Sequence, residues 1–387
     1  MTQPAASPKG SATILLRHSI AVRYTAKRKE RLPMVIKSLQ AGRGIAALAV
    51  AVYHTYLILY QKTGVPQFSG VAQFGYLGVP FFFVLSGFII ALAHHRDIGQ
   101  PAALRDYAFK RFVRVYPLYW FFSIFYVGAA AMGLGDPDFS WAPAHLVEDV
   151  LLVHFTPDFA SPPLKVAWTL FFEIQFYFFF ALAILSARLA WVAAAAWFVG
   201  LLFIPVTNRW LENFLSYWNL AFLCGIAAYV LFRRLPARWW WVFVVAAILC
   251  LAICFAQFSP LELRGRRNIG IVPVSIGFGA LMLGLALFEK ERNVHYGRVI
   301  MLLGDGSYAL YLVHSAVISV AVALYVKLHF TRMIPPSIAF FVILAVAVIG
   351  GIVAHLVVER PFMAWVRRNR RRGRQSEGAP ASSLGSA

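Results

Sequence analysis

Charged residues are scarce in this sequence, and acidic ones are the scarcest. Asp, Glu, Lys and Arg account for 13% of its 387 residues, which is about half the share found in a typical soluble domain. Hydrophobic residues account for 60%, and the mean hydropathy is +0.68. So few charges cannot supply the hydrated surface that a water-soluble domain needs. The composition therefore excludes a soluble globular protein.

Cysteine is also rare. The three cysteines, Cys224, Cys250 and Cys254, all lie within apolar stretches. Their spacing matches neither a disulfide framework nor a zinc site. We therefore interpret them as small packing residues, and we expect no metal site in this protein.

Long apolar stretches are what the sequence has in abundance. They recur from residue 42 to residue 358, and each is about 18–20 residues long, the length of a helix that crosses the hydrocarbon core of a bilayer. We predict an all-α integral membrane fold, a bundle of about ten transmembrane helices. The predicted spans are residues 42–60, 75–95, 115–133, 168–186, 189–206, 214–232, 239–257, 268–288, 307–327 and 336–358.

The two ends of the chain differ from the rest in composition. Residues 1–33 are rich in Ser, Lys and Arg, and their apolar run, residues 14–16, is too short for the core of a signal peptide. We interpret them as a disordered basic tail, or as a stretch that precedes a true start at Met34. Residues 34–362 form the predicted membrane domain, and residues 363–387 are predicted to be a second disordered basic tail.

The formal net charge of +20 does not indicate nucleic-acid binding, because the basic residues lie in short loops and tails. With the N-terminus inside, about 28 of the 36 Lys and Arg residues fall on the cytoplasmic side, so the positive-inside rule puts both termini in the cytoplasm. Arg264, Arg266 and Arg267 are the exception. Either this external run lines a pocket for an anionic group, or the predicted span boundaries there are misplaced.

Two segments outside the spans are distinctive. Residues 102–114 combine basic side chains with Leu, Tyr and Phe, which predicts an amphipathic helix on the cytoplasmic face of the membrane. Residues 134–167 form the longest external segment, which is either an ordinary connector or a place where an acceptor binds. The acidic residues of this segment are Asp136, Asp138, Glu148, Asp149 and Asp158.

Ionisable residues within a membrane are costly and mark candidate functional sites. His54, Glu173 and His314 lie within predicted spans, and Arg43 lies at the cytoplasmic mouth of the first one. Arg43 and His54 are eleven residues apart, so they share one helix face and lie about 16 Å apart along its axis. This arrangement suits a ligand with an anionic head and a reactive arm, such as acyl-coenzyme A. It is also compatible with an Arg that sets topology and a hydrogen-bonded core His.

Glu173 lies near the outer end of a span that runs inward, so its predicted depth nearly coincides with that of His54. A carboxylate and an imidazole at one depth can orient each other or divide acid and base roles. The alternative is that the two residues lie on separate faces and pack against backbone.

Arg111 and Arg114 are three residues apart, on adjacent turns of the predicted cytoplasmic helix. A pair of arginines suits bidentate recognition of phosphate, and Lys110 adds a point charge. Contact with lipid headgroups explains the same residues. Ser86 has no base beside it in the sequence, so we do not interpret it as a nucleophile.

Six short runs resemble the membrane-bound acyltransferase-3 family, and they occur in the order found in that family. The first leads from residues 40–48 to His54, and the runs are distributed between residues 37 and 362, which is nearly the whole of the predicted ordered chain. Each run is weak evidence alone, but six in one order make a specific match. The runs are residues 40–48 (QAGRGIAAL), 81–88 (FFFVLSGF), 111–117 (RFVRVYP), 168–173 (WTLFFE), 303–314 (LGDGSYALYLVH) and 358–361 (VERP).

The resemblance implies a ten-helix bacterial membrane protein that transfers an acyl group, usually acetyl, to a carbohydrate hydroxyl. It implies functional roles for an Arg-x10-His pair, here Arg43 and His54, and for an Arg-x-x-Arg pair, here Arg111 and Arg114. Residues 38–40 are most similar to the exopolysaccharide-type members. Many members carry an Asp before the opening Arg, and this chain has none, so no role for that Asp is carried over.

Together these expectations give one hypothesis, an O-acyltransferase of the bacterial inner membrane. Arg43, Arg111 and Arg114 bind the phosphates of acyl-CoA, expected to be acetyl-CoA, which is a donor substrate and not a permanently bound cofactor. His54 takes the proton of the attacking hydroxyl or carries the acyl group, and Glu173 orients it or binds the sugar. The expected acceptor is a surface polysaccharide or its lipid-linked precursor.

Two other classes of function are compatible with buried ionisable groups. A proton-coupled transporter or flippase for a glycan or anion can relay protons through the same His and Glu, but the sequence shows no paired broken helices in two halves. A non-catalytic scaffold for polysaccharide synthesis has no need of such groups. The acceptor sugar, the length of the acyl group and the oligomeric state are left open by the sequence.

Overall fold

The computed structural model describes residues 36–133, 138–158, 160–259, 262–265, 267–292 and 294–377, with side chains as far as residue 370. The predicted N-terminal tail, the last ten residues of the predicted C-terminal tail, Asp136 and Arg266 lie outside these ranges. All the helices described below belong to one compact unit that begins at Lys37.

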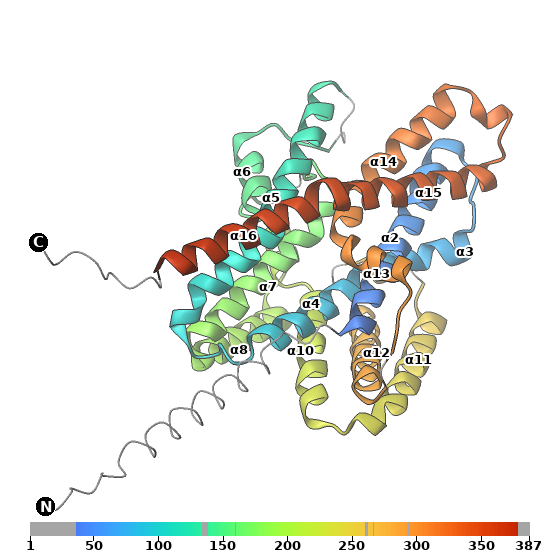
Figure 1. The fold of residues 1–387 in the computed structure, drawn as a ribbon. Helices are drawn as coiled ribbons and strands as arrows, with labels where there is room; N and C mark the ends of the chain where they lie inside the picture. The colour runs from blue at the N-terminus through green and yellow to red at the C-terminus, as the bar shows by residue number, and fades with distance from the viewer. Residues whose placement is uncertain are drawn as a thin grey trace, which may run out of the picture. The chain divides into compact units, whose positions relative to one another are not determined.

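The described residues form helices and no named strand (Figure 1). The α-helices are α2 (Lys37–Thr63), α3 (Ser69–Ala72), α4 (Gly78–His94), α5 (Leu104–Ala131), α6 (Pro143–Leu151), α7 (Trp168–Leu185), α8 (Ala187–Phe203), α9 (Arg209–Phe214), α10 (Asn219–Arg234), α11 (Trp240–Gln257), α12 (Ile271–Glu291), α13 (Arg298–Asp305), α14 (Ser307–Lys327), α15 (Pro336–Ala354) and α16 (Arg360–Glu377). Short 3-10 turns precede or join them at η1 (Gln73–Leu77), η2 (Pro101–Ala103), η3 (Lys165–Ala167), η4 (Ala237–Trp239), η5 (Glu262–Arg264) and η6 (Phe330–Arg332), and a π-turn, η7 (His355–Glu359), joins α15 to α16.

Nine helical segments in the described part of the chain are long and apolar enough to cross a membrane. An all-α membrane bundle is therefore confirmed. The remaining predicted span, residues 189–206, corresponds to the shorter apolar helix α8, which has 17 residues. At 1.5 Å per residue it is about 26 Å long, slightly less than the roughly 30 Å hydrocarbon core.

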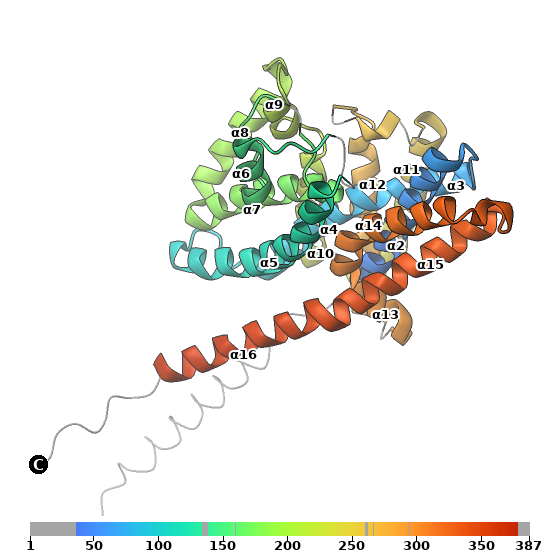
Figure 2. The same ribbon diagram turned by 90° about the horizontal axis from the view of Figure 1, so that it is seen from above.

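Two predicted boundaries differ from the structure. The amphipathic segment 102–114 is not a separate interfacial helix, because α5 continues without a break from Leu104 through the predicted span to Ala131. Pro117 lies inside this helix, and neighbouring helices in a membrane tolerate such a residue. The predicted disordered tail from residue 363 is helical as far as Glu377, where α16 ends. Figures 1 and 2 show α15 and α16 as one long, nearly continuous run.

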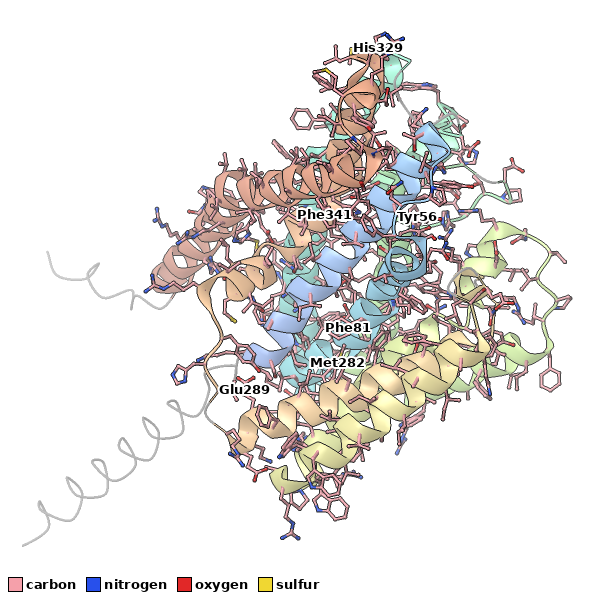
Figure 3. All side chains as sticks on the ribbon, turned by 90° about the vertical axis from the view of Figure 1, so that its right-hand side faces the viewer. Tyr56, Phe81, Met282, Glu289, His329 and Phe341 are labelled. Carbon is pink, nitrogen blue, oxygen red and sulfur yellow. The ribbon has the colours of Figure 1, made fainter. Side chains whose placement is uncertain are left out.

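The bundle has two ends that serve as landmarks. The backbone N–H groups of Lys37 and Ser38, at the start of α2, donate to the Glu289 carboxylate at 2.8 and 2.6 Å. Figure 3 shows Glu289 beside the start of α2 and His329 at the far end of α14. We call the end where α2 begins the Arg43 end, and the opposite end, where η5 precedes α12, the Arg264 end.

Glycines allow the helices around α2 and α4 to pack closely. A Cβ atom added at Gly87 of α4 would collide with the backbone carbonyl of Phe222 in α10, and one added at Gly225 of α10 would collide with the carbonyl of Val84. Such contacts of small residues bring helix backbones together in membranes. The pair α4 and α10 is therefore held by close backbone contact at the two glycines, with aromatic contacts such as Phe83 on Phe222 beside them.

Close glycine contacts also fix the position of Arg43. A Cβ atom at Gly44 would lie 2.9 Å from the backbone nitrogen of Gly304 in α13, and one at Gly304 would collide with the carbonyl of Gln40. The Gln40 side chain also donates to the Asp305 carboxylate. The first turns of α2 are thus held against α13, so the position of Arg43 is set by the sequence runs at residues 40–48 and 303–314.

The long segment at the Arg264 end is ordered by a buried carboxylate. Glu148 of α6 accepts hydrogen bonds of 2.6 Å from the backbone N–H groups of Phe155 and Thr156. Burial and the negative charge of Glu148 raise the pKa of the Asp149 carboxyl to about 7. Three aromatic side chains of α5, Tyr116, Tyr119 and Trp120, donate to carbonyls at the end of α6. The described part of this segment is therefore ordered and attached to α5.

We expect Gly225→Ala to destabilise the protein strongly, because the methyl group has only a backbone carbonyl in front of it. Overpacking typically costs about 1–3 kcal/mol, and a rigid backbone neighbour puts this site at the upper end. Gly128→Ala in α5 is the matched control, since a Cβ there meets nothing within 4 Å and Ala favours a helix over Gly by roughly 0.5–1 kcal/mol. Thermal unfolding in detergent measures both variants, and equal melting temperatures would contradict the close-packing interpretation.

Candidate active site

A cavity of about 380 Å³ opens at the Arg43 end, between α2, α4, α5, α7, α14 and α16. Its walls are mainly aromatic and aliphatic, which is typical of a site for a small molecule. Its polar lining combines cations with one acidic side chain and several hydroxyl groups. These polar residues are Arg43, Ser86, Lys110, Arg111, Arg114, Thr169, Glu173, Tyr177, Ser307, Tyr308, Tyr311, Arg367 and Arg370.

Arg111 presents an incompletely satisfied guanidinium to this cavity. One terminal nitrogen lies 3.5 Å from Nε2 of His94, and the guanidinium carbon lies 5.9 and 5.7 Å from the ring centres of Tyr107 and Tyr177. Its buried Nε has no hydrogen-bond partner among the described protein atoms. A held cation with an unused donor fits the binding of an anionic group.

Arg114, three residues further along α5, is engaged differently. Its guanidinium forms a 2.9 Å ion pair with Glu359, which is 5% exposed, and lies 4.7 Å from the ring centre of Tyr308. His355 completes the group through a 2.8 Å contact with the other oxygen of Glu359. The two arginines that were predicted to bind phosphate therefore differ. Arg111 faces the cavity without a described carboxylate partner, whereas Arg114 is ion-paired with Glu359 of η7. Glu359 was not predicted as a site residue, although it is the one acid in the run 358–361.

Helix α16 adds two cations that the sequence analysis assigned to a disordered tail. Arg367 and Arg370 line the cavity beside Lys110. The Arg370 guanidinium forms an ion pair with Asp106 of α5 and lies 5.3 Å from the ring centre of Phe109. The outer part of the cavity is thus a basic cleft between α5 and α16, and its sequence signal was the continued run of Arg after residue 360.

Glu173 also faces this cavity, from the second turn of α7. Its carboxylate accepts hydrogen bonds from the hydroxyl groups of Tyr177 and Ser86, the latter at 3.5 Å. In the described structure Glu173 makes no hydrogen bond with His54. The predicted pairing of these two residues is therefore not observed.

The partner of His54 is His314, from α14. Nδ1 of His54 lies 3.2 Å from Nε2 of His314, and the ring centres are 4.9 Å apart in an edge-to-face arrangement. His314 is fully buried, and His54 is half-buried. Both histidines were predicted to be ionisable residues within the membrane, but their contact was not predictable because 260 residues separate them in the chain.

The hydrogen-bond network assigns the tautomer of both rings. Nδ1 of His314 lies 3.0 Å from the carbonyl oxygen of Leu310, so it carries the proton and Nε2 accepts. Nδ1 of His54 faces that acceptor and the carbonyl oxygen of Val50, which is 3.0 Å away. It therefore donates to both, and in the neutral ring the other nitrogen of His54, Nε2, carries no proton. A neutral imidazole in this form has the lone pair that a general base requires.

An aromatic wall separates the cavity from the histidine pair. Tyr311 lines the cavity, and its ring centre lies 5.8 Å from that of His314 and 5.9 Å from that of Phe82. The Tyr311 hydroxyl group is held by the Val166 carbonyl at 3.0 Å and the Thr169 hydroxyl at 2.8 Å. His54 is not part of the cavity lining. Arg43, Arg111, Arg114 and Glu173 thus share one chamber, and His54 lies beyond its wall.

Comparison with known proteins agrees with the resemblance seen in the sequence. The chain matches the protein family described as "Acyltransferase domain" over residues 36–356. It is 29% identical over 386 residues to "Acyltransferase MdmB" of Streptomyces mycarofaciens, covering 89% of this chain and 94% of that protein. It is 27% identical over 316 residues to "Exopolysaccharide production protein ExoZ" of Rhizobium meliloti (strain 1021), covering 77% and 92%. No solved structure matches the chain. Because the family match includes every helix from α2 to α15, this multi-pass membrane protein belongs to the acyltransferase-3 family of enzymes.

Proposed function

We propose that the protein moves an acyl group, with acetyl as the expected one, from acyl-CoA to a hydroxyl group of a carbohydrate. The Arg43 end faces the cytoplasm of a bacterial inner membrane, and the acceptor approaches from the Arg264 end. The observation that carries the proposal is the placement of a basic cavity directly against a wall behind which a neutral His pair lies. The name of the relative ExoZ refers to exopolysaccharide production, which supports a surface polysaccharide or its precursor as acceptor.

The donor end of the cavity suits the shape and charge of acyl-CoA. The basic cleft formed by Lys110, Arg111, Arg367 and Arg370 holds the phosphates where the cavity opens. Arg43 also lines the cavity, and the Tyr311 ring forms its wall on the side of His314. Because guanidinium groups bind phosphate oxygens in bidentate fashion, the phosphates stay at the mouth while the pantetheine arm extends along the apolar walls. Displacement of the Tyr311 ring admits the thioester to His54.

The chemical step uses the free nitrogen of His54. Nε2 takes the proton of the acceptor hydroxyl as its oxygen attacks the thioester carbonyl carbon. The tetrahedral intermediate collapses, the C–S bond breaks, and the thiolate of CoA takes the proton from the imidazolium. His314 keeps the ring in the required tautomer throughout. Glu173 holds Tyr177 and Ser86 in the donor chamber, so its role is to shape the path of the acyl arm and not to orient His54.

We expect His54→Ala to lower the rate of transfer by about 10²–10⁴-fold, the range typical of general-base catalysis. The measurement is the release of free CoA thiol by purified protein in nanodiscs, given acetyl-CoA and the glycan fraction of the source strain. Retained binding of acetyl-CoA shows that the variant is folded. Normal rates in the variant would remove His54 from the mechanism, and a wild-type protein that releases no CoA in the presence of acceptor would favour the transporter.

His314 is a positioning residue. Replacing it should show whether it acts through its hydrogen bond to His54 or only by filling space. His314→Leu removes one of the two acceptors for the Nδ1 proton of His54 and leaves the Val50 carbonyl. It should lower kcat by about tenfold or more, since a hydrogen bond to a group that becomes charged contributes roughly 1.5–3 kcal/mol. His314→Gln supplies a carbonyl acceptor and should recover part of the loss. Equal kcat values for the Leu and Gln variants would show that His314 only fills space.

Arg111→Gln should raise KM for acetyl-CoA by about tenfold with little change in kcat, because it removes a charge-assisted contact made before the chemical step. Arg105→Gln is the matched control, since Arg105 belongs to the same helix but is exposed and does not line the cavity. Initial rates of CoA release against acetyl-CoA concentration measure both. A change in kcat alone would move Arg111 from donor binding to the reacting centre.

A further inference from the structure

The run Arg264, Arg266 and Arg267 is unusual because it lies at the Arg264 end, away from the basic cleft. The structure divides the two members that it describes. Arg267 donates through both terminal nitrogens, at 3.2 Å each, to the backbone carbonyls of Leu215 and Leu201. Its guanidinium is therefore used to hold α8 and the residues that follow α9 in place. Arg267 needs no ligand to explain it.

Arg264 has no such partners. Its guanidinium carbon lies 4.6 Å from the ring centre of Tyr53 in α2 and 5.3 Å from that of Tyr76 in η1. Its Nε is buried and meets no hydrogen-bond acceptor in the described part of the protein, and no described carboxylate lies within ion-pair distance of it. A buried donor without a partner is costly, which points to an acceptor that comes from outside the chain.

Glu262, the described acidic residue nearest to Arg264 in the sequence, does not form an ion pair with its guanidinium. Glu262, in the same turn η5, directs its carboxylate to the backbone N–H of Ser259 at 2.7 Å. The side chain of Asn268 donates to the Glu262 backbone carbonyl at 2.6 Å. These contacts fix the turn and leave the guanidinium of Arg264 facing the two tyrosine rings.

Arg264 is also close to the reacting centre of the proposed mechanism. The ring centre of Tyr53 lies 5.0 Å from that of His54 and 4.6 Å from the Arg264 guanidinium carbon. The guanidinium carbon is therefore less than about 10 Å from the His54 ring, a distance that one sugar residue with its substituents can bridge. Arg264 and Lys165 are the described cations that act electrostatically on His54.

We propose that Arg264, seated on Tyr53 and Tyr76, binds an oxyanion carried by the acceptor, a carboxylate or a phosphate attached to the sugar whose hydroxyl is acylated. The inference rests on the proposed function and names its acceptor class as an acidic glycan. The planar guanidinium gives a carboxylate or phosphate two parallel hydrogen bonds, and the tyrosine rings provide a flat surface for the sugar ring. The anion anchors one side of the sugar so that a hydroxyl on its other side meets Nε2 of His54.

The test compares variants in a strain that lacks the chromosomal copy, with the acetyl content of its surface glycan measured by mass spectrometry. Arg264→Gln should lower acetylation about tenfold or more, and Arg264→Lys, which keeps the charge, should lie between. Affinity of the purified variants for acetyl-CoA should be unchanged. Arg332→Gln, an exposed residue of η6 at the same end of the bundle, is the control and should acetylate normally.

Normal acetylation in the Arg264→Gln strain would overturn the inference. A His54→Ala strain is measured in parallel. Normal acetylation in the His54→Ala strain would contradict the proposed function. A defect in that strain together with normal acetylation in the Arg264→Gln strain would contradict only the role of Arg264. A defect in Arg264→Gln with intact acetyl-CoA binding supports it.

A second measurement avoids any risk that the variant fails to fold. Wild-type protein, with its donor site saturated by acetyl-CoA, is heated with methyl glucuronide, its neutral amide, or inorganic phosphate. A higher melting temperature with the glucuronide than with the amide identifies a sugar carboxylate as the anion. A higher melting temperature with phosphate alone identifies a phosphorylated or lipid-diphosphate acceptor. No shift with either anion would overturn the inference.

Discussion

A charge at bilayer depth is expensive, and this constraint explains how the interior of the bundle is arranged. Arg114 meets Glu359, and Glu173 meets two hydroxyl groups. The two histidines satisfy each other and the carbonyls of their own helices. Arg111 and Arg264 each keep a buried Nε without a described hydrogen-bond partner, and both lie against tyrosine rings. The two proposed substrates meet the protein at these two arginines, one at each end of the bundle.

The helices were predictable from the sequence because apolar length is a local property. Nine predicted spans recur as helices of sufficient length, and the tenth recurs as α8. Arg43 and His54 do belong to one continuous helix, α2, so the relation between them could be worked out from helical spacing without knowledge of their neighbours. The predicted boundaries were wrong where a helix continues past a change in composition, as in α5 and α16. A polar segment that leaves the membrane can remain helical, so a change in composition does not mark the end of a helix.

The arrangement of the site was less predictable because it depends on how helices meet. Equal depth suggested that Glu173 would pair with His54, but depth fixes only one coordinate, and rotation of α7 about its axis turns Glu173 into the cavity. His314 was visible as an intramembrane histidine, yet its contact with His54 arises from the packing of α14 on α2. The glycine contacts between α2 and α13 and between α4 and α10 help to fix these orientations. Each contact depends on two helices, so the sequence of one helix alone does not predict it.

The Tyr311 wall has a consequence for the cell as well as for catalysis. A hollow inside a membrane bundle needs an inner boundary, or the two faces of the membrane would be joined. The Tyr311 ring lies between the cavity and His314, and its hydroxyl group is fixed by Val166 and Thr169. In the described structure this one ring therefore keeps the contents of the Arg43 end apart from those of the Arg264 end, and the two compartments meet only when it moves.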